Sequence, residues 1–192
     1  MERENLIIIG SSAGGPRILK ELFADIPNLN ACILIVQHMP AFVNVPFTAS
    51  LDQLTPMRVS LAQDGDRLAV GQVYLAPSGM HLVLEQNRVI RLRGTDKVNF
   101  VCPAVDVTMM SLTPSKETTL IGVILTGMGK DGAQGLVHMK SLGALTLAQD
   151  EATSIIYGMP KEAVKTGKVD HELPTAAIAR KLTEVVGLRR AY

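Results

Sequence analysis

The sequence has 192 residues, enough for one domain with a buried core, and 47% of them are hydrophobic while 19% are charged. This balance excludes a disordered chain, because disordered segments combine low hydrophobicity with high net charge. Nineteen basic and eighteen acidic residues leave a net charge of +1, and Trp is absent. We therefore expect no nucleic-acid partner, since neither a basic surface nor a base-stacking platform is available.

The cysteines and histidines give no sign of a metal site. Cys32 and Cys102 form no CxxC motif, and the four histidines lack the spacing of paired ligands. Cys32 lies in an apolar run and is predicted to be a small core residue. The first apolar run, Leu6–Ile9, is too short for a signal peptide or a membrane span. We predict a cytoplasmic protein without metal and without membrane insertion.

Four apolar, β-branched runs indicate buried strands, and glycine-rich or polar loops lead from them into helices. The predicted strands are Leu6–Ile9, Ala31–Val36, Leu120–Leu125 and Ala144–Ala148. The predicted helices run from Pro16 through Phe23, from about Val43 to Leu54, from the loop after the third strand to Leu142, and over Ala176–Val186.

The region between positions 58 and 93 has a different pattern. Val73–Leu75, His81–Glu85 and Arg88–Leu92 are predicted to be short strands, and Gln86-Asn87 is typical of a tight hairpin turn between the last two. The whole pattern predicts an α/β fold with three layers. It would contain a doubly wound, mainly parallel sheet, helices on both faces, and an antiparallel hairpin addition.

Three unusual loops follow buried strands of this predicted sheet. They are GSSAGG at 10–15, QHMP at 37–40 and TGMGKDG at 126–132. In doubly wound sheets, functional residues gather where the carboxyl ends of strands lead into helices. The common position of the loops favours one shared site.

The first loop contains a candidate nucleophile. Residues Gly10–Gly14 fit G-x-S-x-G between a strand and a helix, the context in which this motif forms a nucleophile elbow with Ser12 at its centre. The alternative is a phosphate-binding turn whose serines only cap the helix. A P-loop is excluded because Pro16 follows Gly15 where that motif requires Lys.

Two further residues fit a catalytic triad. His38 directly follows the second strand, and a serine hydroxyl needs a base of this kind within hydrogen-bond reach. Asp131 could hold the imidazole in its useful tautomer. The main-chain N–H of Met128 could bind an oxyanion, while its side chain is expected to pack. His81, His138 and His171 are expected to have packing or surface roles.

A dinucleotide-binding module remains the competing interpretation. Gly127, Gly129 and Gly132 form a GxGxxG pattern after a strand, and Asp150 follows about twenty residues later, as in the Rossmann fingerprint. Against this, Asp131 would lie beside a pyrophosphate at a helix N-terminus, and the unit comes late in the chain. The residues favour the triad and leave this alternative open.

The ordered loops resemble the catalytic domain of the protein-glutamate methylesterases of bacterial chemotaxis. The resemblance runs from Leu6 to about Val186, and its six motifs occur in the family's order. They are GSSAGG at 10–15, QHMP at 37–40, YLAP at 74–77, PAVD at 103–106, GVILTGMGKDG at 122–132 and YGMPKEA at 157–163.

This resemblance implies a serine hydrolase on a doubly wound sheet, with Ser12 rather than Ser11 as nucleophile, His38 as base and Asp131 as the orienting acid. The N–H of Met128, with a second donor at Ala13, would bind the oxyanion. The implied reaction is hydrolysis of glutamate γ-methyl esters on the cytoplasmic helices of chemoreceptors, with release of methanol. Deamidation of receptor glutamines is the related activity, and no cofactor is expected.

Two departures from the family bear on partners. Family members commonly carry an N-terminal receiver domain, whereas residues 1–192 are predicted to form a single methylesterase-like catalytic domain without one. A separate receiver or regulator protein is then a candidate partner. In addition, Cys102 stands where the family commonly has Arg, which puts the substrate preference in question. A non-catalytic receptor-binding relative is the third interpretation.

Overall fold

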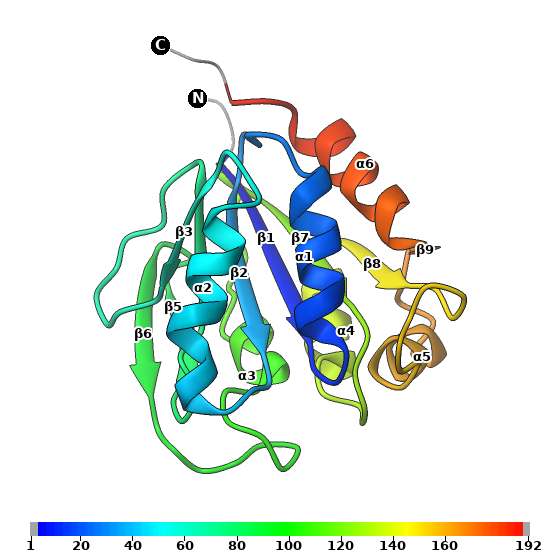
Figure 1. The fold of residues 1–192 in the computed structure, drawn as a ribbon, viewed down its shortest axis with the longest axis horizontal. Helices are drawn as coiled ribbons and strands as arrows, with labels where there is room; N and C mark the ends of the chain where they lie inside the picture. Colours follow the sequence, from blue (N-terminus) through cyan, green and yellow to red (C-terminus); the bar gives the residue numbers. More distant parts are fainter. Residues whose placement is uncertain (1–3, 190–192) are drawn as a thin grey trace.

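The computed structural model describes residues 4–189 (Figure 1). The main sheet is parallel and has seven strands, in the order β3-β4-β2-β1-β7-β8-β9. All six strand pairings of this sheet are parallel. The strands are β1 (Glu4–Ser11), β2 (Cys32–Gln37), β3 (Arg58–Leu61), β4 (Gln72–Leu75), β7 (Thr118–Ile124), β8 (Leu145–Gln149) and β9 (His171–Leu173).

A separate two-stranded hairpin accounts for the antiparallel addition. Strands β5 (His81–Glu85) and β6 (Val89–Arg93) pair antiparallel. The turn residues Gln86 and Asn87 have φ angles of 52° and 56°. Two successive positive φ angles are typical of a type I′ turn, so the predicted hairpin is confirmed.

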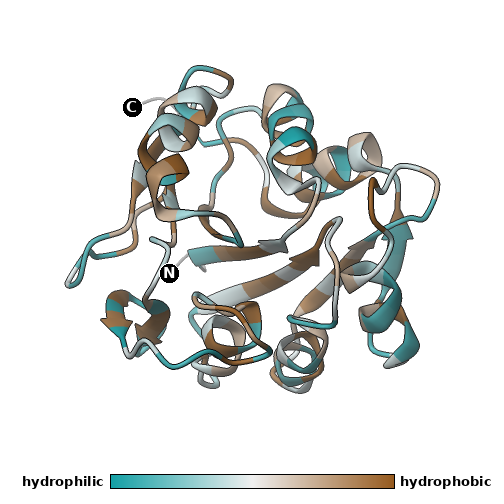
Figure 2. Cartoon of the chain, turned by 60° about the horizontal axis from the view of Figure 1, so that its bottom comes forward, coloured by the Kyte–Doolittle hydropathy of each residue, from teal (hydrophilic) through white to brown (hydrophobic). Residues whose placement is uncertain are grey.

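Helices cover both faces of the main sheet, which confirms the predicted three layers (Figure 2). One face carries α1 (Gly15–Asp25), α2 (Asn44–Asp52) and α6 (Thr175–Val186). The other face carries α3 (Val105–Met110), α4 (Ala133–Ser141), α5 (Met159–Lys165) and the hairpin. A single turn of 3-10 helix, Ala41–Val43, precedes α2.

The central strands are apolar at successive positions because both of their faces are covered. Ile7 and Ile9 of β1 belong to the core under α1, α2 and α6, whereas Leu6 and Ile8 belong to the core under α3, α4 and α5. These four side chains are at most 2% exposed. Burial on both faces explains the continuous apolar runs that predict the strands.

The order of the strands creates a topological switch point beside β1. The chain leaves β1 for β2 on one side and later reaches β7 on the other side. The helices that follow, α1 and α4, lie on opposite faces of the sheet. The chain after β1 and the chain after β7 therefore leave the sheet toward opposite faces, and open sheets bind ligands at the carboxyl ends of the strands beside such a point.

Several short elements are additional to those predicted. Strands β3 and β9 extend the sheet at its two edges, and α3 and α5 have only six and seven residues.

Val73–Leu75 belongs to the parallel sheet through β4. His171, expected in a loop, begins β9. Within the described residues, the helices lack the length and apolarity needed to cross a membrane.

Candidate active site

Ser12 and His38 lie next to each other at the carboxyl ends of β1 and β2. The last paired residues of these strands are Ser11 and Gln37, and the main-chain N–H of His38 donates to the Ser11 carbonyl at 3.1 Å. Ser12 and His38 are the next residue on each strand. The structure thus brings the predicted nucleophile beside the predicted base, with the His38 side chain 12% exposed.

Asp131 reaches the same site from the loop between β7 and α4. Its Oδ2 atom lies 2.8 Å from Nε2 of His38. Because a carboxylate only accepts hydrogen bonds, this contact places the imidazole hydrogen on Nε2 and leaves the lone pair on Nδ1. Nδ1 is therefore the nitrogen available as a base, the reverse of the arrangement in which Nε2 faces the serine.

The carboxylate of Asp131 is buried and receives four hydrogen bonds. Besides His38, the donors are the main-chain N–H of Val105 at 2.7 Å, the main-chain N–H of Asp106 at 3.0 Å and the side-chain amide of Asn99 at 3.0 Å. Burial raises the pKa of Asp131, but these hydrogen bonds, led by the one from His38, outweigh it and hold the pKa below its ordinary value. Asp131 is ionised at neutral pH.

Ser11 and Ser12 have different environments. Ser11 is fully buried, and its hydroxyl donates to Oε1 of Gln37 at 2.6 Å. Ser12 is partly exposed, and among residues 4–189 its hydroxyl makes no hydrogen bond. A nucleophile must be accessible and free to approach its base, so the structure favours Ser12 over Ser11.

Gln37 links the carboxyl ends of β1 and β2 next to the candidate site. Its Nε2 donates to the carbonyl of Ser12 at 2.9 Å and to the carbonyl of His38 at 2.7 Å. With the hydroxyl of Ser11 on its oxygen, this buried amide uses both hydrogens and accepts a third bond. This role of Gln37 is not predicted from the sequence, because it depends on the positions of the Ser12 and His38 carbonyls.

Two main-chain N–H groups are available to bind an oxyanion. Within the described residues, the N–H groups of Ala13 and Met128 donate to no protein acceptor, whereas the N–H of Ser12 is used by the Thr126 carbonyl at 3.0 Å. The loop after β7 approaches the loop after β1 closely at Gly127. A side chain there would not fit, because its Cβ would lie 3.0 Å from the Ser12 nitrogen. The Met128 side chain is 77% exposed, so the prediction that it packs is wrong.

The groups that would bind a dinucleotide are already hydrogen-bonded within the protein. The N–H groups of Gly132 and Gly135, at the start of α4, donate to the carboxylate of Asp106 at 3.0 and 2.7 Å and are not free for a pyrophosphate. The Asp150 carboxylate accepts from the N–H and hydroxyl of Thr153 within its own turn. These contacts disfavour a role for Asp150 in binding a ribose.

The remaining histidines lie outside the candidate site, and two of them are bonded within the fold. His81 is buried and bonded through both ring nitrogens, and Nε2 of His138 lies 2.9 Å from the Leu112 carbonyl. His171 is exposed on β9. In the described part of the chain, no group of three or more His, Cys, Asp or Glu side chains could hold a metal ion.

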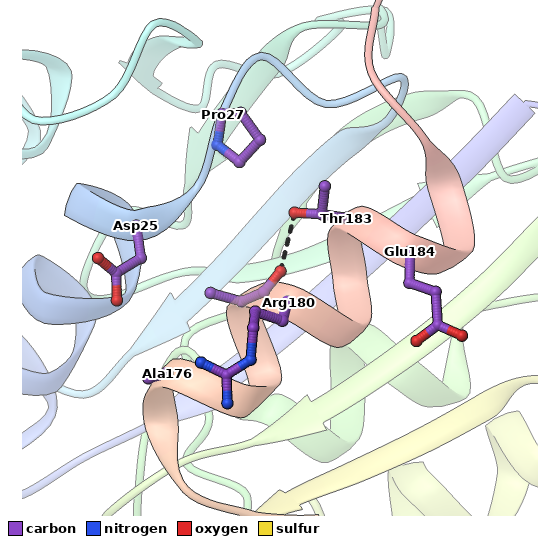
Figure 3. A pocket seen from close by; sticks show the side chains of 7 residues that line it. Asp25, Pro27, Ala176, Arg180, Thr183 and Glu184 are labelled. Atoms are coloured by element: carbon purple, nitrogen blue, oxygen red, sulfur yellow. Dashed lines mark hydrogen bonds between the residues drawn. The ribbon is translucent and has the colours of Figure 1, made fainter.

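A groove of about 660 Å³ between α1 and α6 offers no comparable chemistry (Figure 3). Its lining combines small or apolar residues with the charged Asp25, Arg180 and Glu184. The Thr183 hydroxyl there is bonded to the Ala179 carbonyl at 2.9 Å. Asp25 ends α1, about 15 Å along the helix from its start beside Ser12. The groove therefore plays no part in the site.

Comparisons of sequence show which known proteins this chain is similar to. The family model for the CheB methylesterase matches residues 7–182. A protein-glutamate methylesterase/protein-glutamine glutaminase of Bordetella parapertussis is 44% identical over 190 residues, which are 97% of this chain and 54% of that protein. The protein of the same name from Ralstonia nicotianae is 46% identical over 174 residues, covering 89% and 46% of the two chains. The chain spans about half the length of the curated relatives it matches.

A solved structure gives the same result for the fold. The crystal structure of the Thermotoga maritima CheB methylesterase catalytic domain superposes with a TM-score of 0.89 at 39% sequence identity, covering 95% of this chain and 99% of that one. The family match spans most of the sequence and includes the three loops that meet at the site. The chain belongs to the CheB methylesterase family.

Proposed function

We propose that the chain is a serine esterase that hydrolyses glutamate γ-methyl esters on the cytoplasmic helices of chemoreceptors and releases methanol. The observation that carries this proposal is the arrangement of Ser12 beside His38, with the imidazole bonded to the buried Asp131 at 2.8 Å. The names of the relatives, which describe both a methylesterase and a glutaminase, support deamidation of receptor glutamines as the second activity.

The reaction begins with attack by the Ser12 oxygen on the ester carbonyl. Nδ1 of His38 takes the serine proton, while Nε2–H stays bonded to Asp131, whose negative charge stabilises the imidazolium. The carbonyl π electrons move to oxygen, and the N–H groups of Met128 and Ala13 bind the resulting oxyanion. One such donor typically contributes a factor of about 10²–10³ to the rate.

The tetrahedral intermediate collapses when the bond from carbon to the methoxy oxygen breaks. The imidazolium of His38 gives its proton to the leaving oxygen, and methanol departs. A water molecule then attacks the glutamyl ester on Ser12, with His38 as base once more, and the glutamate carboxylate is released. In deamidation the leaving group is ammonia, and the remaining steps are the same.

Methanol release tests this proposal. Chemoreceptor membranes carrying labelled methyl groups would be incubated with the chain and with the variants Ser12→Ala, His38→Ala and Asp131→Asn. Release by the wild type that Ser12→Ala abolishes, and that the other two sharply reduce, would support both reaction and triad. Receptor binding without release, together with inactivity on a small activated ester, would instead identify a non-catalytic relative. The receptor substrate also implies a cytoplasmic location, which cell fractionation would test.

A further inference from the structure

The side-chain amide of Asn99 lies between two buried carboxylates. Its Nδ2 donates to Oδ1 of Asp131 at 3.0 Å and to Oδ2 of Asp106 at 2.8 Å. An amide nitrogen carries two hydrogens, so both are used. Asp131 belongs to the proposed triad. Asp106 has no hydrogen bond to Ser12 or His38 among the described residues, and the triad mechanism gives neither Asp106 nor Asn99 a role.

The two carboxylates also hold each other's helices. Asp131 accepts the main-chain N–H groups of Val105 and Asp106 at the start of α3. In return, Oδ1 of Asp106 accepts the N–H groups of Gly132 and Gly135 at the start of α4, which directly follows Asp131. Any movement of Asp106 is therefore transmitted to Asp131 through the main chain as well as through Asn99.

The pKa values of the two carboxyl groups are shifted in opposite directions. The pKa of Asp106 is raised, chiefly by burial and further by the charge of Asp131, although its hydrogen bonds from Gly135, Asn99 and Gly132 oppose the rise. The pKa of Asp131 is lowered in spite of its burial, with the hydrogen bond from Asn99 among the causes. Asn99 is the one side chain in the described structure that donates to both carboxylates.

The segment that carries Asn99 is held in a constrained turn. Val98 and Val101 exchange two main-chain hydrogen bonds of 3.0 and 3.1 Å around Asn99 and Phe100, whose φ angles are 54° and 67°. A left-handed conformation costs an ordinary residue about 1–2 kcal/mol. The Phe100 side chain is 93% exposed and cannot offset that cost by packing. The hydrogen bonds of Asn99 can offset it.

A buried imidazole fixes the same segment at both ends. Nε2 of His81 lies 2.7 Å from the carbonyl of Asp96, and Nδ1 of His81 accepts the main-chain N–H of Ala104 at 3.1 Å. His81 thus links the two ends of the segment from 96 to 104. In the middle of this segment, Asn99 contacts Asp131. Strained residues that their surroundings hold in place are a common feature of functional sites.

We propose that Asn99 is a positioning residue, whose amide bridges the carboxyl groups of Asp131 and Asp106 and so keeps Oδ2 of Asp131 directed at His38. The role rests on the proposed esterase function, because it acts through the triad. Among the described residues, the side-chain amide of Asn99 makes no hydrogen bond to Ser12, Ala13 or Met128. Its loss should consequently slow the chemical step and leave substrate binding nearly unchanged.

The test compares Asn99→Gly with the matched variant Asn87→Gly. Glycine removes the amide and tolerates the left-handed φ, so each variant retains its turn. Asn87 also has a positive φ in a tight turn, is buried, and holds Thr113 through three hydrogen bonds, but it lies in the β5–β6 hairpin. Hydrolysis of a small activated ester would be measured for both variants, together with their thermal unfolding.

We expect Asn99→Gly to lower kcat about tenfold to a hundredfold with KM nearly constant, because misplacing a catalytic group by about 1 Å can cost that much. Asn87→Gly should lose stability and keep its kcat. A second readout is the carbon-13 NMR titration of the Asp131 carboxyl, assigned by its absence in Asp131→Asn. In Asn99→Gly this titration should move to higher pH, and in Asn87→Gly it should stay in place.

An unchanged kcat in Asn99→Gly, a loss no greater than that in Asn87→Gly, or an unmoved Asp131 titration would each overturn the proposal. Failure of the esterase function gives a different result. The wild type would then hydrolyse no ester, and the proposed role in catalysis would fall with it. The titration would still report whether Asn99 controls Asp131.

Discussion

The hydroxyl of Ser11 donates a 2.6 Å hydrogen bond to the side-chain oxygen of Gln37, out of contact with solvent. The same amide holds the carbonyls of Ser12 and His38, so the residue before the proposed nucleophile helps to set the separation between it and the proposed base. Two adjacent serines thus have different tasks. One supports the backbone of the site, and the other, which is partly exposed, is the proposed nucleophile.

Replacing each serine by alanine should separate these tasks. Ser12→Ala removes the nucleophile and should abolish hydrolysis without reducing thermal stability. Ser11→Ala leaves the oxygen of Gln37 without its buried donor, which costs about 1–3 kcal/mol of unfolding free energy, and should lower activity only partly. Urea unfolding, ester hydrolysis and labelling by a serine-directed phosphonate would check this. Labelling that persists in Ser12→Ala and disappears in Ser11→Ala would contradict the assignment.

Asp131→Asn should preserve the fold and reduce kcat by about 10⁴, as expected when the acid that fixes a catalytic imidazole is made neutral. The asparagine can direct an N–H at Nε2 of His38, which would favour the tautomer whose Nδ1 carries the hydrogen. The control is Asp150→Asn, since the Asp150 carboxylate bonds only within its own turn at Thr153. Equal rates for the two variants would exclude Asp131 from the triad.

Much of the site follows from the sequence because the strands are long, apolar runs and their carboxyl ends meet at one edge. Ser12, His38 and Asp131 occupy the loops after β1, β2 and β7, which the order of the strands brings together. The orientation of the His38 ring could not be predicted, because it depends on which nitrogen Asp131 reaches.

Other features depend on contacts between distant segments. The contacts of Asn99 with two carboxylates arise only after the hairpin, α3 and α4 have packed on the same face of the sheet. Strand β9 has three residues and is defined by pairing with β8 rather than by an apolar pattern. Met128 is exposed because its loop turns away from the core, although a methionine usually packs.

The unfolding free energy at acid pH should depend on the ionisation of Asp131. Its pKa is lower in the folded chain than the ordinary value of 3.8, so its contribution to stability is complete above that value and is lost as the pH falls through the folded pKa. The difference in unfolding free energy between wild type and Asp131→Asn should therefore be smaller at about pH 3 than at about pH 7. Urea unfolding at the two pH values measures it.

The neighbouring carboxylate should behave in the opposite sense. The pKa of Asp106 is raised, mainly by burial, so its ionised form is penalised in the folded chain and stability is lost as the pH rises through the folded pKa. As the pH falls, the unfolding free energy of the wild type should rise relative to that of Asp106→Asn and fall relative to that of Asp131→Asn. The same pH dependence in both variants would show that the pKa values of the two carboxyl groups are not shifted in opposite directions.

The contact between Gly127 and Ser12 leads to the last prediction. A Cβ at position 127 would lie 2.8 Å from the Ser12 Cβ and 3.0 Å from the Ser12 nitrogen, so Gly127→Ala must move the loop that bears the nucleophile. The matched control is Gly143→Ala, because Gly143 has a φ of +84° and open space around it. Its substitution costs backbone strain of about 1–2 kcal/mol and no contact. Gly127→Ala should lower kcat about a hundredfold, since small displacements of reacting groups are costly. Gly143→Ala should keep its kcat while its thermal midpoint falls, and equal kcat values in the two variants would show that the spacing between these two loops does not govern the reaction.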